Sequence, residues 1–171
     1  MSDPIERGGL TMLDGAALVT GAAVASVHFR EFAGELARLD LRGWAMVSVA
    51  YTWLALTSAG PFVFLVRRSG RRPPGYPGVG DVSWLAIGSP WLIAALFISA
   101  SGGSFNPANG FYTNALWIAL YVVSAIGMVG LLRTWPAVGP KPQRRSWTDA
   151  VGRAIAATWP LQLGLGFVVI R

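Results

Sequence analysis

His28, Glu31 and Glu35 are the residues whose types and spacing come closest to a metal site. They share one face of a helix that continues past residue 29, because side chains three and four positions apart are neighbours on a helix. An imidazole beside two carboxylates is suited to hold a metal or to sense pH, since imidazole titrates near neutrality. Functional metal sites use more ligands than this set provides, so we favour an interfacial histidine and expect no metal.

Asp14 is an ionisable residue within the first apolar run, where a charged group is a candidate for proton transfer or pH sensing. The letters TMLD place Thr11 and Asp14 in the spacing of a capping box, in which each side chain binds the other residue's amide. We therefore expect Asp14 to cap a helix. Asp81 and the pair Ser146 and Asp149 mark two further helix starts in the same way.

The stretch VRRSGRRPPGYPGVGD, residues 66–81, combines a cluster of arginines with glycines that resemble a phosphate cradle. It lacks the Lys-Ser/Thr of a P-loop and follows no strand of a β-α unit. A loop between two apolar runs lies at the membrane surface. There, the attraction of each arginine to anionic lipid headgroups contributes about 1 kcal/mol. We assign this role of lipid contact and topology to Arg67, Arg68, Arg71 and Arg72.

Catalytic and cofactor motifs are missing from the sequence. A single histidine and the lack of cysteine exclude bis-histidine haem, thiolate and iron-sulfur ligation from this chain alone. The sequence contains no G-x-S-x-G, S-x-x-K or H-E-x-x-H motif. We therefore expect a protein that is not an enzyme and that binds no cofactor.

Three apolar runs contain a proline, at Pro61, Pro90 and Pro160. Counting the rise per residue from one membrane face places all three at about 8 to 12 Å depth. Transporters use such interrupted helices to line a binding site, and Trp91 and Trp159 are suited to form its walls. The alternative interpretation is ordinary packing, because membrane helices tolerate proline.

Composition predicts a membrane protein, with 53% hydrophobic residues, 13% charged residues and a mean hydropathy of +0.49. Five apolar runs are separated by charged or turn-rich segments, which predicts an all-α bundle of five transmembrane helices in one integral membrane domain, 1–171. The expected spans are 12–29, 44–66, 82–101, 114–132 and 154–170.

Segment 29–39 is predicted to be a short amphipathic helix in the membrane interface. Its apolar residues lie on one helical face and its charged residues on the other. The first and fifth runs are marginal in length for a crossing. A bundle of four spans, with residues 1–42 outside, is therefore the alternative.

Basic residues predict the orientation, because they accumulate on the cytoplasmic side of short loops. With the N-terminus inside, the inner segments carry Arg7, Arg67, Arg68, Arg71, Arg72, Arg133, Lys141, Arg144, Arg145 and Arg153, and the outer segments carry Arg30, Arg38, Arg42 and Arg171. This distribution favours a cytoplasmic N-terminus and an external C-terminus in a bacterial inner membrane. The net charge of +6 is thus attributed to topology and lipid contact, not to nucleic acid binding.

Small residues at helical spacing predict close contacts between helices, either in the bundle or with a partner. They are Ala17, Gly21 and Ala25 in the first run and Ser124, Gly127 and Gly130 in the fourth. We expect a non-enzymatic accessory, assembly or scaffold element that contacts a membrane protein or a second copy of itself. The alternative function is a small binder or transporter of neutral or lipid-like molecules, with its pocket at the proline-interrupted helices.

Overall fold

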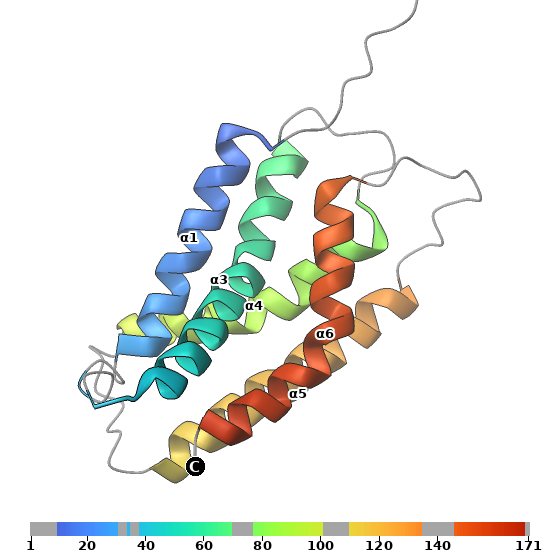
Figure 1. The fold of residues 1–171 in the computed structure, drawn as a ribbon. Helices are drawn as coiled ribbons and strands as arrows, with labels where there is room; N and C mark the ends of the chain where they lie inside the picture. The colour runs from blue at the N-terminus through green and yellow to red at the C-terminus, as the bar shows by residue number, and fades with distance from the viewer. Residues whose placement is uncertain are drawn as a thin grey trace, which may run out of the picture.

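The structure is a computed structural model that describes residues 10–30, 34, 38–69, 77–100, 110–134 and 146–169. Within these residues the chain is all-helical, with five helices and no strand (Figure 1). The prediction of an all-α fold is confirmed for this part of the chain. Most of the predicted interfacial helix, 29–39, lies outside the described residues.

Each helix covers one of the five predicted apolar runs. The helices are α1 (Met12–Phe29), α3 (Leu41–Ser69), α4 (Val79–Ala100), α5 (Gly110–Thr134) and α6 (Trp147–Val169). The helix α6 begins well before the apolar run at 154, because the Ser146 hydroxyl accepts a hydrogen bond from the Asp149 amide at 3.1 Å and caps its start. Hydropathy marks the lipid-facing part of a helix, whereas caps mark its ends.

Three of these helices, α1, α3 and α4, are long and apolar enough to cross a membrane. The helix α3 has 29 residues and a length of about 43 Å, which exceeds a hydrocarbon core of roughly 30 Å. In α5, the described residues Ile118–Leu131 form a shorter apolar stretch. The apolar helices indicate a membrane-embedded protein.

The helices α3 and α4 form the centre of the bundle. The helix α1 packs along α3 in the opposite direction, α5 packs on α4, and α6 contacts both α4 and α3 (Figure 1). Apolar side chains from all five helices form the core between them: Ala17, Ala25, Leu54, Ala59, Val63, Trp84, Ile87, Trp91, Leu120, Tyr121, Ile155 and Trp159.

Glycines allow the backbones of α1, α3 and α4 to approach closely. A Cβ atom at Gly21 of α1 would meet the backbone of α3, with the Ala59 Cβ at 2.8 Å. A Cβ atom at Gly60, on α3 itself, would meet the backbone carbonyl of Trp84 on α4. The central helix is therefore held by close backbone contacts on two sides.

Candidate functional site

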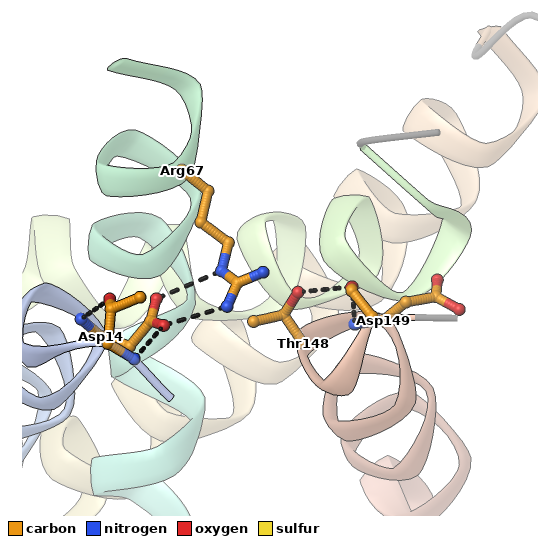
Figure 2. Close-up of polar contacts among 6 residues, drawn as sticks. Asp14, Arg67, Thr148 and Asp149 are labelled. Carbon is orange, nitrogen blue, oxygen red and sulfur yellow. Dashed lines mark hydrogen bonds and ion pairs between the residues drawn. The ribbon is translucent and has the colours of Figure 1, made fainter. Parts of the chain in front are cut away.

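One end of the bundle contains a cluster of buried polar side chains with the half-buried Trp147 beside them. We call this cluster the junction, and its residues are Asp14, Arg67, Asp81, Trp147, Thr148 and Asp149. The N-terminal ends of α1, α4 and α6 meet there with the C-terminal end of α3 (Figure 2). Each aspartate lies in the first turn of its own helix, where the free backbone amides favour a carboxylate. The aspartates differ in what else they contact.

Asp14 caps α1 and also binds α3. Its Oδ2 accepts a hydrogen bond from the Thr11 amide at 3.0 Å, and the Thr11 hydroxyl accepts one from the Asp14 amide at 3.1 Å. This confirms the predicted capping box. The same carboxylate accepts two hydrogen bonds from Arg67, at 3.2 Å from Nε and at 2.9 Å from Nη2 (Figure 2). Bidentate geometry is the strongest arrangement of such a pair.

Arg67 differs from its predicted role as a headgroup contact. Its side chain is only 9% exposed and that of Asp14 only 1%, so the pair is buried between α1 and α3. The guanidinium also lies 5.2 Å from the centroid of the Trp147 ring, which gives α6 a cation-π contact with α3. The reason is that α3 extends to Ser69, which places Arg67 within its last turn rather than in the following loop.

The remaining arginines of the predicted headgroup set have other positions. Arg68 is exposed at the end of α3, where a lipid headgroup can reach it. Arg71 and Arg72 lie outside the described residues.

Asp149 joins α6 to α4. Its Oδ1 accepts a hydrogen bond from the Gly80 amide at 2.7 Å, and its Oδ2 accepts one from Arg153 at 2.9 Å. The backbones of the two helices touch here, since a Cβ atom at Gly80 would meet the Asp149 carbonyl and one at Gly152 would meet the Gly80 carbonyl. Glycine at both positions is what brings the Asp149 carboxylate within reach of the first turn of α4.

Asp81 has only neutral neighbours as hydrogen-bond donors. Its Oδ2 accepts a hydrogen bond from the Gly78 amide at 2.9 Å. Its Oδ1 is buried and has no hydrogen-bond partner among the described residues, although the Thr148 hydroxyl faces the carboxyl group. The nearby arginines of the described segments pair with the other two aspartates, Arg67 with Asp14 and Arg153 with Asp149.

Hydroxyl groups connect the buried part of the junction to its rim. Thr148 is fully buried, and its Oγ1 lies 2.8 Å from the Oγ of Ser146 (Figure 2). Ser146 precedes α6 and is half-buried. A hydroxyl both donates and accepts, so this pair is able to pass a proton along as well as to stabilise the helix start.

His28 lies at the opposite end of α1, buried rather than interfacial. Its Nε2 is 3.0 Å from the Trp91 carbonyl oxygen, and its ring meets the Trp91 ring edge-on at 5.5 Å. Glu31 and Glu35 lie outside the described residues, so the proposed face of three side chains is not part of the described structure. Within the described residues, no three His, Asp or Glu side chains are grouped to hold a metal.

The residues expected to line a pocket have different surroundings. Trp91 and Trp159 both contact the Tyr121 ring, with centroid distances of 5.3 and 4.7 Å, and form a packed aromatic layer. Pro61 is buried, whereas Pro160 is exposed, so these two prolines do not face a common interior space. Pro90 is half-buried on α4.

The long-range contacts of the junction were missed by sequence reasoning. A signal for one of them is present: Asp14 is close to the start of α1 and Arg67 is close to the end of α3. In two antiparallel neighbours these positions have equal depth, so opposite charges there predict an ion pair. The contact between Asp149 and Gly80 has no comparable signal.

Comparisons with known proteins identify no relative. No family model matches the chain, and neither a curated protein nor a solved structure is significantly similar to it.

Proposed function

We propose that this protein is a non-enzymatic, multi-pass protein of a bacterial inner membrane that serves other membrane proteins as an accessory, assembly or scaffold element. The observation that carries the proposal is the one-sided packing of α5. Tyr121 and Ser124 face α4, and the Ser124 hydroxyl donates a hydrogen bond to the Ile87 carbonyl at 3.2 Å.

The opposite face of α5 is apolar and exposed. Its large residues recur at spacings of three and four and so form one stripe: Ile118, Val122, Val123, Ile126 and Val129. β-Branched side chains lose little conformational freedom when they are packed, because their χ1 angle is already restricted in a helix. A Cβ atom at Gly130, beside this stripe, would meet nothing within 4 Å, which leaves room for a neighbouring helix.

Purification in mild detergent tests this proposal. We expect a partner or a second copy to co-purify at fixed stoichiometry, and Ile126→Trp to reduce its amount at least tenfold. Val19→Trp is the matched control, because Val19 is an equally apolar, 71% exposed residue on α1. If the wild-type protein is monomeric and free of partners, the scaffold function is rejected.

A second candidate function is the binding or transport of a neutral or lipid-like molecule. It is favoured by the hydroxyls of Thr57 and Ser58, which are fully buried and have no hydrogen-bond partner among the described residues. Pro61 lies one turn later and lacks the amide that would bind the Thr57 carbonyl. A few polar atoms inside an apolar bundle are typical of sites for neutral ligands.

Binding of a fluorescent diacylglycerol analogue in nanodiscs tests this second function. We expect Pro90→Ala, Trp91→Ala and Thr57→Val to weaken binding with unchanged expression, and Val19→Ala to leave it unchanged. Equal binding by all variants would reject a site at these helices.

A further inference from the structure

Among the described residues, the carboxyl groups of the junction outnumber the arginines that pair with them. The Asp14 carboxylate accepts hydrogen bonds from Nε and Nη2 of Arg67. The Asp149 carboxylate accepts hydrogen bonds from the Gly80 amide and from Nε of Arg153. Asp81 is only 4% exposed and forms an ion pair with neither arginine. If all three aspartates were charged, the junction would contain a net negative charge removed from water.

Burial decides which form of Asp81 is the more stable. Moving an unpaired carboxylate out of water has a free-energy cost of several kcal/mol. The amides and the dipole at the start of one helix stabilise the charge by less than this cost. Among the described residues, Asp149 of α6 disfavours the charged form of Asp81, and Arg67 of α3, which is paired with Asp14 of α1, favours it. The effect of burial is larger than either. Arg153 of α6 is paired with Asp149.

We propose that Asp81 is a proton-binding site, and that the folded protein holds a proton on this carboxyl group to a higher pH than an exposed aspartate does. The proton occupies Oδ1, the oxygen atom without a partner, while Oδ2 keeps the hydrogen bond from the Gly78 amide. From Oδ1 the O–H faces the Thr148 hydroxyl, which in turn is hydrogen-bonded to Ser146 at the rim. The inference does not depend on the proposed scaffold function.

The hydroxyl pair supplies the route by which the proton exchanges with water. A protonated Asp81 would donate to the Thr148 hydroxyl, which lies beside the carboxyl group, and Thr148 would then donate to Ser146 Oγ, 2.8 Å away. Ser146 is half-buried at the end of the bundle. Each step transfers a hydrogen bond between oxygen atoms, and one proton enters or leaves for each charge gained or lost by Asp81. Neutral Asp81 also removes the repulsion from the neighbouring Asp149 carboxylate.

Infrared spectroscopy of the full-length protein in nanodiscs tests the proposal directly. We expect a carboxylic acid C=O band that persists to a higher pH than that of an exposed aspartate, that Asp81→Asn abolishes and that Asp81→Glu moves to another frequency. Asp40→Asn is the matched control and keeps the band, because Asp40 is an exposed aspartate outside the junction. A wild-type band that is lost at the pH of an exposed aspartate, or a band that persists in Asp81→Asn, overturns the proposal.

Stability measurements give a second readout that a purely structural role of Asp81 would not produce. The folded protein holds its proton to a higher pH than the unfolded chain, whose aspartates ionise near pH 4, so the free energy of unfolding decreases as the pH rises above about 4. Over this rise, wild-type protein therefore loses stability relative to Asp81→Asn, which has no proton to release. Parallel stability curves for the two proteins overturn the proposal.

Discussion

At the scale of single residues, the contact between Asp14 and Arg67 shows a side chain serving two parts of the fold at once. The Asp14 carboxylate satisfies the first turn of α1 and neutralises a guanidinium on α3. A buried charge needs such a partner, because an isolated one is unstable outside water. The pair therefore ties the start of one helix to the end of its neighbour.

Removing one partner of this pair is expected to destabilise the protein. Asp14→Asn leaves Arg67 buried without its counter-charge, and the free energy of unfolding should fall by about 3 to 5 kcal/mol. Arg67→Met removes the other charge and should cost a similar amount. We expect the double variant to lose much less than the sum of the two, as measured by denaturant unfolding in detergent with tryptophan fluorescence.

An additive double variant would contradict this energetic coupling. Arg42→Met is the control for the loss of an arginine, because Arg42 is exposed at the start of α3 and its loss should change stability by less than about 0.5 kcal/mol.

The local half of this site could be predicted from the sequence and the long-range half could not. Thr11 and Asp14 are three positions apart, so their contact follows from helix geometry alone. The contact of Asp14 with Arg67 depends on how far α3 continues past its apolar run. Hydropathy does not indicate where α3 ends, so Arg67 is predicted from the sequence to lie in the loop and to contact lipid.

At the scale of helices, small residues decide where backbones touch. Ala17, Gly21 and Ala25 of α1 are all buried, as their spacing predicts. In α5 the same pattern gives a mixed result, because Ser124 is buried whereas Gly130 is exposed. A stripe of small residues thus predicts a contact face but not whether the face is occupied within the chain.

The crossing of α4 and α6 offers a test of backbone contact. Gly152→Ala places a methyl group against the Gly80 carbonyl, and the helices must separate. We expect the free energy of unfolding to fall by about 1 to 3 kcal/mol, as measured by thermal denaturation in detergent.

The matched control for this test is Gly15→Ala on α1, where a Cβ atom would meet nothing within 4 Å. That change should be neutral or raise stability by up to about 1 kcal/mol, because alanine favours a helix more than glycine does. Equal effects of the two substitutions would show that α4 and α6 are not in backbone contact.

At the scale of the whole molecule, the distribution of arginines predicts one orientation in the membrane. Reporters fused after residues 75 and 107 should report the cytoplasm and the outside, respectively, since the first loop is rich in arginine and the second has no charge. In that orientation the junction lies at the cytoplasmic face. A reporter at residue 75 on the outer face would reverse the orientation of the junction.

The approximate positions of the five helices in the described residues could be predicted from apolar runs alone. The arrangement of the helices could not, because it depends on contacts between segments that are far apart in the chain, such as Asp149 with Gly80. Turn-rich segments indicate where helices stop, but they do not specify which helices become neighbours.

Glycines give some helix pairs close backbone contact and leave others in contact through side chains, so the helices differ in how easily they move. The helix α3 is locked to α1 and α4 by backbone contacts at Gly21 and Gly60, so these three helices cannot slide past one another without steric collision. The helix α5 meets α4 mainly through side chains, and a Cβ atom at Gly127 would lie 3.9 Å from its nearest atom on α4, the Ala86 carbonyl oxygen. Side chains adjust by changing rotamer, whereas touching backbones do not. A force applied across this bundle would therefore displace α5 first and leave the rest as one stiff body.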